Sequence, residues 1–161
     1  MKLVIIGAIF LLVFISGCVS QTIEGPDVLY VAPATGVTGS NVTVEVKFND
    51  VQNVLGYQFD MSYDPTVLEF VSAERGDFLR SLGHDSFFVN PKEETPGELK
   101  HFAEAVLNGG DGIPGSGTAV VVTFYALKPG TSSLELKGVK VLGTDNTEID
   151  MDLRAGTVTV S

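Results

Sequence analysis

The sequence predicts an all-β protein with a β-sandwich fold. After residue 27, apolar and polar side chains alternate at every second position in most segments, which is typical of strands with one buried and one exposed face. Short stretches rich in glycine and proline separate these segments, and we find no pattern of a long helix. With 161 residues, 44% of them hydrophobic, the chain suits one domain around a single core.

Residues 1–17 are predicted to be a lipoprotein signal peptide. Lys2 gives a positive start, and the apolar run from Leu3 to Phe14 is shorter than the roughly 20 residues of a spanning helix. Ile15-Ser16-Gly17-Cys18 resembles the lipobox of prokaryotic lipoproteins, in which the bond after Gly17 is cleaved and Cys18 receives the lipid. This resemblance implies a protein held on the extracellular face of the cell membrane by its lipid alone. A plain signal peptide and an uncleaved anchor are the alternatives.

Residues 18–27 are predicted to be the lipid-attachment cysteine and a tether. Val19 to Asp27 is polar, contains Gly25-Pro26 and shows no hydrophobic period. At 3.3 to 3.6 Å per residue this segment reaches roughly 30 Å. It would keep the domain formed by residues 28–161 close to the membrane.

The strongest strand pattern lies in Gly56 to Tyr63. Tyr57, Phe59, Met61 and Tyr63 share one side of a two-residue period, and Gly56, Gln58, Asp60 and Ser62 share the other. Asp64-Pro65 ends this strand, because proline cannot donate to a ladder. We expect the polar side, with Gly56 at its head, to be the functional surface.

Other segments show the same strand pattern. A first strand is expected at Val28 to Ala32, a second at Val42 to Phe48 and a short connection at 49–52. Residues 78–82 suit a helical turn, 91–97 a polar loop and 108–117 a glycine-rich loop, and 118–127 a central strand packed on both faces. A strand is also expected at 99–107, but its pattern does not indicate which of its faces is buried. Further strands are expected at 67–71, 85–90, 134–137, 149–153 and 158–160.

Charge and cysteine content exclude several functions. The 10 Lys and Arg against 20 Asp and Glu give a net charge of -10, which argues against nucleic-acid binding and against adhesion of the folded part to anionic lipid. A single cysteine allows no internal disulfide and no CxxC metal clip, so the fold depends on its core.

An ordered set of motifs resembles the cohesin family. The set contains Val46-x-Phe48, the run Gly56-Tyr57-Gln58-Phe59-x-x-x-Tyr63-Asp64-Pro65-x-x-Leu68, Phe102-Ala103-Glu104, a glycine-rich loop and Val120 to Ala126. The resemblance covers Val28 to Ser161. It implies a jelly-roll β-sandwich of about nine strands that binds calcium-loaded dockerins, which are small helical domains, and so assembles complexes, with a link to polysaccharide degradation. The calcium would belong to the dockerin, and neither a metal nor a cofactor is implied here.

The resemblance also implies which residues contact the dockerin. The family's usual asparagine and aspartate of the early strand are matched here by Gly56 and Gln58, so we expect a dockerin of an uncommon type. The implied contact residues are Gly56, Gln58, Asp60, Asn90, Glu104, Asn146 and Glu148.

Four alternatives to this interpretation stay open. The polar residues of the Gly56 strand, and Glu104, could simply face solvent. Asp111 in the glycine-rich loop, or else Asp145, Glu148 and Asp150, could bind calcium, although no EF-hand spacing is present and incidental acidic loops are favoured. A carbohydrate-binding module shares this sandwich, but its flat aromatic platforms are disfavoured by 0 Trp. His84 and His101 lie in unlike contexts and we find no catalytic motif, so we expect a protein that is not an enzyme, although a paired-carboxylate glycosidase stays open.

Overall fold

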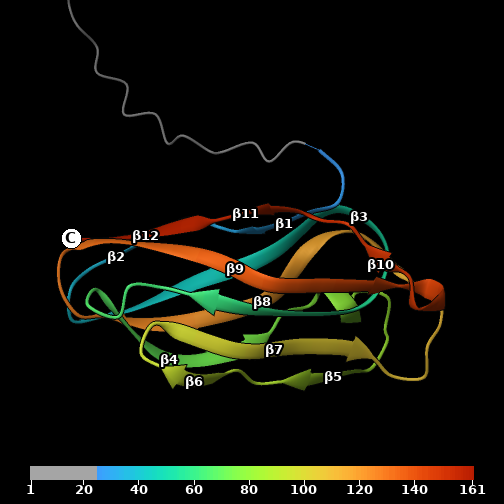
Figure 1. Cartoon of the computed structure of the whole chain (residues 1–161), viewed down its shortest axis with the longest axis horizontal. Helices are drawn as coiled ribbons and strands as arrows, with labels where there is room; N and C mark the ends of the chain where they lie inside the picture. The colour runs from blue at the N-terminus through green and yellow to red at the C-terminus, as the bar shows by residue number, and fades with distance from the viewer. Residues whose placement is uncertain (1–24) are drawn as a thin grey trace, which may run out of the picture.

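The computed structural model describes residues 25–161, and the predicted signal peptide, Cys18 and most of the tether lie outside this part. The described chain is an all-β sandwich with two short 3-10 turns, which confirms the predicted fold class (Figure 1). It has more strands than the nine expected, because short separate strands form several of the sheet edges. In chain order the elements are β1 (Val28–Val31), β2 (Ala34–Gly36), β3 (Asn41–Ser62), β4 (Leu68–Arg75), η1 (Phe78–Arg80), β5 (Ser86–Val89), β6 (Lys92–Thr95), β7 (Glu98–Val106), β8 (Ile113–Ala126), β9 (Gly130–Gly143), η2 (Thr144–Asn146), β10 (Glu148–Ile149), β11 (Asp152–Arg154) and β12 (Gly156–Val160).

The two layers share the long strand β3. Its second half lies between β7 and β9, and β5 and β6 extend this layer beyond β7 while β10 extends it beyond β9. Its first half lies between β1 and β8, with β4 beyond β8 and β11 beyond β1. The start of β9 also pairs with β12, which pairs with β2. We call the first layer the front sheet, because it faces the viewer in Figure 1.

β3 corrects the prediction of two strands joined by residues 49–52. The chain stays extended through this region, and two register shifts beside β8 bend it from one sheet into the other. Asp50 and Asn53 adopt positive φ angles of 48° and 56° at the bend, a conformation that Asp and Asn tolerate better than most residues. One strand therefore contributes to both faces of the core.

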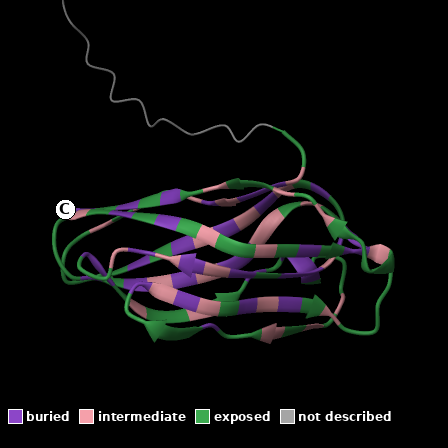
Figure 2. Cartoon of the chain, in the orientation of Figure 1, coloured by how far each residue is buried: buried purple, intermediate pink, exposed green. Residues whose placement is uncertain are grey.

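The core lies between the sheets and contains the inward residues predicted for Gly56 to Tyr63. Tyr57, Phe59, Met61 and Tyr63 are all buried, and Phe59 stacks on Phe102 with ring centroids 4.7 Å apart. Buried and exposed residues alternate along the strands, as Figure 2 shows. The alternation confirms that each layer presents one face to the core.

Two predicted loops are partly strands. Residues 92–95 form β6, which pairs with β7, and β8 begins at Ile113 inside the glycine-rich segment because that segment pairs with β3. The helical turn expected at 78–82 is present as η1. Within residues 25–161 there is no helix long and apolar enough to cross a membrane.

Candidate functional site

The outward face of the front sheet carries two rows of side chains that run across its strands. In the first row, Leu142 on β9 is opposite Gly56 on β3, which is opposite Ala105 on β7, which is opposite Phe87 on β5. Directly opposite residues point to the same face of a sheet, and these four residues are all apolar. Glu148 on β10 pairs with Leu142 and lies at the outer end of the same row.

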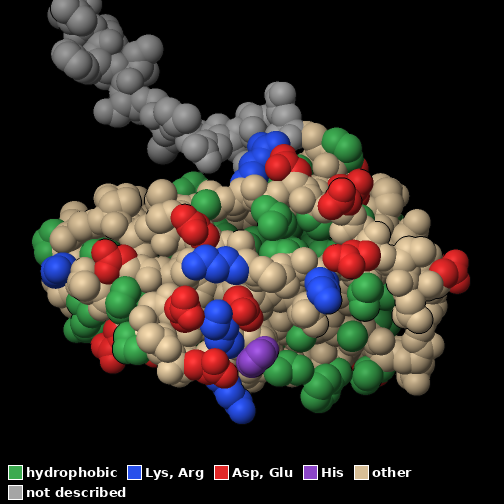
Figure 3. All heavy atoms as spheres, viewed as in Figure 1, with side chains coloured by type: hydrophobic (Ala, Val, Ile, Leu, Met, Phe, Trp, Pro, Cys, Tyr) green, Lys and Arg blue, Asp and Glu red, His purple; other side chains and the backbone are tan. Residues whose placement is uncertain are grey.

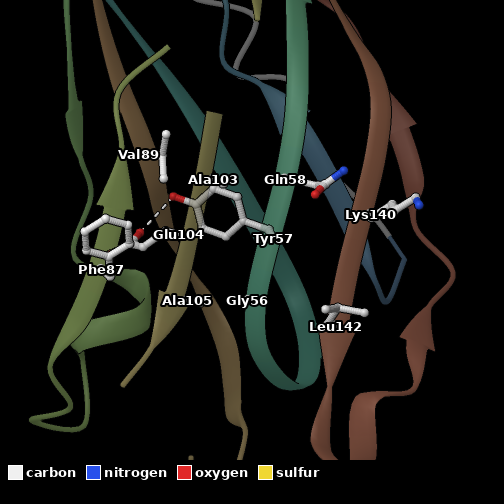
Figure 4. A pocket seen from close by; sticks show the side chains of 10 residues that line it. All are labelled: Gly56, Tyr57, Gln58, Phe87, Val89, Ala103, Glu104, Ala105, Lys140 and Leu142. Atoms are coloured by element: carbon white, nitrogen blue, oxygen red, sulfur yellow. Dashed lines mark hydrogen bonds between the residues drawn. The ribbon is translucent and has the colours of Figure 1, made fainter. Parts of the chain in front are cut away.

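The second row is partly polar. It contains Lys140, Gln58, Ala103 and Val89, on the same four strands and in the same order. Together the two rows line a shallow hollow of ≈ 300 Å³ (Figure 4). Gly56, Ala103 and Ala105 form its floor with Gln58 beside them, and the side chains of β5 and β9 form its two walls. We call this hollow the front groove.

The walls of the front groove expose large apolar side chains. Phe87 is 63% exposed, Leu142 41% and Val89 38%. All three line the same hollow on one sheet face, so they form a patch rather than scattered surface residues. A contiguous apolar patch with polar neighbours is typical of an interaction site.

Beyond the groove the same face becomes charged. Asp60 accepts a hydrogen bond from the backbone N–H of His101 at 2.9 Å and forms an ion pair of 3.2 Å with Lys100. Burial pushes the pKa of Asp60 up, but the His101 N–H and the Lys100 ammonium outweigh it and hold the pKa below its ordinary value. Figure 3 shows the charged side chains gathered over the middle of this face. Asp60 therefore lies on the predicted face, and its carboxylate already interacts with the His101 N–H and the Lys100 ammonium of β7.

The prediction that the Glu104 side chain lies on this outward face is wrong. The side chain is only 2% exposed and points into the core, where it accepts a hydrogen bond from the Tyr57 hydroxyl at 2.8 Å (Figure 4). It also accepts a hydrogen bond from the Ser86 hydroxyl. The Tyr57 hydroxyl also lies 2.9 Å from the carbonyl oxygen of Ala119. Burial, followed by the charge and hydrogen bond of Glu104, raises the pKa of Tyr57 well above its ordinary value. This buried network links β3, β7 and β5 underneath the front groove.

A bulge in β7 explains the inward position of Glu104. Phe59 and Met61 are two residues apart on β3, whereas their partners Phe102 and Leu99 are three apart on β7. The extra residue shifts the alternation, and His101 takes a positive φ of 67° at this point. Phe102 and Glu104 consequently face the core, and Ala103 and Ala105 face outward.

The structure brings together some of the other predicted contact residues. Gly56 is the floor of the groove, and Gln58 is exposed beside it. Asn90 is exposed directly after Val89, and Asn146 is exposed in η2, outside the residues that line the groove. The residues that the sequence argument missed are the walls and the alanine floor. They are Phe87, Val89, Ala103, Ala105, Lys140 and Leu142.

The acidic residues considered as calcium ligands do not converge. Among the described residues, no three His, Cys, Asp or Glu side chains are grouped as metal ligands would be. Asp111 lies in the loop before β8, whereas Asp145, Glu148 and Asp150 are exposed around η2 and β10. The arrangement of the described residues therefore gives no support to a calcium site at Asp111 or at Asp145, Glu148 and Asp150.

Comparison with known proteins identifies the family. Residues 29–160 match the model of the cohesin domain, whereas a search of curated protein sequences finds no significant match. A non-cellulosomal cohesin from Archaeoglobus fulgidus superposes with a TM-score of 0.69 at 20% identity, covering 85% of this chain and 92% of the other. The seventh ScaB type I cohesin from Pseudobacteroides cellulosolvens gives a TM-score of 0.67 at 23% identity, covering 83% and 90%.

A third structure contains a cohesin together with a dockerin. It is the Coh-OlpA-Doc918 complex from Clostridium thermocellum, with a TM-score of 0.70 at 15% identity, covering 85% of this chain and all (100%) of the other. At these identities the structures show a shared fold. The family model, which spans nearly all of the described residues, shows the membership. The chain therefore belongs to the cohesin family, whose domains are non-catalytic modules that bind dockerins.

Proposed function

We propose that this cohesin binds a calcium-loaded dockerin through the front groove. The observation that carries the proposal is the row of exposed apolar side chains, Phe87 and Leu142, on either side of Gly56 and Ala105. Strand backbones hold these side chains at fixed spacing, so docking orders little flexible chain and loses little conformational entropy. Gln58 and Lys140 supply polar contacts at the edge of the apolar area.

The first test is direct binding. The full-length chain in detergent micelles is titrated calorimetrically with calcium-loaded dockerins, and the titration is repeated with a calcium chelator. Binding that needs calcium supports the proposal, because chelation unfolds the partner's calcium loops while no calcium site is proposed for the cohesin. Binding to no dockerin contradicts it.

A substitution in the front groove tests whether the dockerin binds there and not on another surface. Phe87→Ser should weaken binding by at least about tenfold, because we assign Phe87 to the few large apolar contacts whose truncation costs about 2 kcal/mol or more. Thr131→Ala, an exposed position at the opposite end of β9, is the matched control. Equal affinities for both variants would place the dockerin on another face.

We further propose that Cys18 is lipidated and holds the domain on the outer face of the cell membrane. The lipobox-like sequence from Ile15 to Cys18 supports this proposal. Expressed in a prokaryotic host, the wild-type chain should enter the detergent phase on phase partitioning, and Cys18→Ser should enter it much less. Recovery of both chains in the aqueous phase would rule out the lipid anchor.

The assembled complex is proposed to act on polysaccharide, with the cohesin itself contacting the sugar only through its partner. Support comes from the fold shared with a type II cohesin from the cellulosome of Acetivibrio cellulolyticus, at 20% identity and a TM-score of 0.67. The full-length chain should therefore not be retained on cellulose, chitin or xylan unless a dockerin-bearing enzyme is added. Retention that soluble sugar displaces would favour the carbohydrate-binding alternative.

A further inference from the structure

The front groove has the width of one α-helix. Its walls stand on β5 and β9, with β7 and β3 between them, so three strand spacings separate the walls. At 4.7 to 4.9 Å per spacing, the wall strands are about 14 Å apart. An α-helix with its side chains is about 10–12 Å in diameter. A helix lying along the strands therefore fits between Phe87 and Leu142.

The floor of the groove allows a helix to approach the sheet closely. In the first row, Gly56 and Ala105 present nothing larger than a methyl group between the two walls, whereas in the second row the exposed Gln58 lies beside the small Ala103. Side chains on the underside of a docked helix can therefore enter the hollow of ≈ 300 Å³. In the first row of the groove the hollow is bordered by Phe87 and Leu142 and by two small residues between them. The side chain that enters the hollow there should therefore be aliphatic.

One wall of the groove is basic beyond its apolar end. Lys140 lies one row from Leu142 on β9, and Lys137 lies farther along the same strand. Neither lysine forms an ion pair with another residue in the described part of the chain, although Lys100 is paired with Asp60. These two free ammonium groups occur in a protein with a net charge of -10. An acidic partner group would complement this wall.

We propose that the partner docks a helix on which an aliphatic side chain and a carboxylate lie one turn apart. The aliphatic side chain enters the hollow over Gly56 and Ala105, and the carboxylate pairs with Lys140. The two rows of the groove are two residues apart along a strand, or about 6.7 Å. Positions i and i+4 of a helix are about 6 Å apart along its axis, and they lie on the same face. This inference rests on the proposed dockerin binding and specifies the chemistry of the dockerin's contact helix.

The experiment uses four versions of one dockerin that binds the wild-type chain. At two surface positions four residues apart on its contact helix, they carry Leu with Glu, Leu with Lys, Ser with Glu, or Ser with Lys. Each is titrated in calcium against the full-length wild-type cohesin in detergent and against Lys140→Glu. Lys128→Glu is the control, because Lys128 is exposed in the turn before β9 and its substitution makes the same change in net charge.

The Leu and Glu version should bind the wild-type cohesin most tightly. Lys140→Glu should weaken that binding about tenfold and should prefer the version with Leu and Lys, since opposite charges are then restored. Replacing Leu by Ser should weaken binding to every cohesin variant at least about tenfold. Adding salt should reduce the difference in affinity between the wild-type chain and Lys140→Glu more than it reduces the effect of Leu.

Two outcomes would overturn the inference while leaving dockerin binding intact. Lys140→Glu could behave like Lys128→Glu with all four dockerins, or the Ser and Lys version could bind the wild-type chain as tightly as the Leu and Glu version. Failure of any dockerin to bind the wild-type chain would instead remove the proposed function. The two failures are therefore distinguishable within one set of titrations.

Discussion

Replacing Gly56 by arginine should abolish dockerin binding while the domain stays folded. Gly56 lies in the floor of the front groove, between Leu142 and Ala105. Any side chain at this position projects from the outward face into the space that we assign to the partner. The inward neighbours Tyr57 and Phe59 point the other way and stay in the core.

The cost to the fold is expected to be small but measurable. A Cβ at position 56 would lie 3.1 Å from the carbonyl oxygen of Glu104 and 3.3 Å from the Cβ of Ala105. β7 would have to move by a few tenths of an ångström, which resembles mild overpacking and costs about 1–2 kcal/mol. For a domain of this size, the melting temperature should fall by roughly 2–8 °C.

The cost to binding should be much larger. An arginine in the floor excludes the aliphatic side chain from the hollow and separates the helix from both walls. Loss of a central contact of this kind costs about 2–4 kcal/mol, or roughly 30- to 700-fold in affinity. Gly56→Ala should disturb the packing against β7 to a similar degree, but it adds only a methyl group to the hollow. The Gly56→Ala variant should therefore bind the dockerin more tightly than Gly56→Arg.

Calorimetric titration with a calcium-loaded dockerin, combined with thermal unfolding followed by circular dichroism, checks both costs. Thr157→Arg is the matched control, because Thr157 is exposed on β12, outside the front groove. Unchanged affinity in Gly56→Arg would show that the dockerin binds elsewhere. Loss of the folded state would show that Gly56 is required by the fold rather than by the partner.

Three further predictions concern stability. Glu104→Ala removes the acceptor of the Tyr57 and Ser86 hydroxyls and should lower the free energy of unfolding by about 2–4 kcal/mol in urea denaturation; a loss below about 0.5 kcal/mol would contradict a structural role. The pKa of Asp60 lies below its ordinary value, so its stabilising contribution is present above that ordinary value and is lost as pH falls through the lowered pKa. Asp60→Asn should lack this step in acid unfolding. Burial and then the hydrogen bond to Glu93 raise the pKa of Tyr63 from 10.0 to about 12, so stability should fall as pH rises through this interval, and Tyr63→Phe should not show that fall.

The fold class followed from the sequence because alternation reports burial directly. Val44, Val46 and Phe48 alternate with polar residues and are all buried in β3. The continuity of β3 could not be predicted, since Asp50 and Asn53 are residues that usually mark turns. Only pairing with β8 and β9 on either side keeps the backbone extended through them.

The site could be predicted only along one strand. Gly56 and Gln58 were found because their own strand alternates clearly, with Tyr57 and Phe59 inward. The wall residues Phe87 and Leu142 lie 31 and 86 residues after Gly56 in sequence, and their position beside Gly56 depends on register. Phe87 and Phe88 are adjacent phenylalanines, so the sequence does not indicate which of them faces outward. Register places Phe87 in the groove and Phe88 beside Glu104.

The β7 bulge beside Asp60 explains both why Glu104 faces inward and why the floor of the groove contains small side chains. Counting alternate residues from the buried Leu99 would place Phe102 and Glu104 on the outside of β7 and the two alanines inside. The bulge reverses this order, and the Asp60 carboxylate accepts the His101 N–H at the bulge. Without the reversal, a phenylalanine and a charged glutamate would replace Ala103 and Ala105 in the floor. Asp60 therefore acts on the groove from outside it, by stabilising the bulge that turns two small side chains toward the partner.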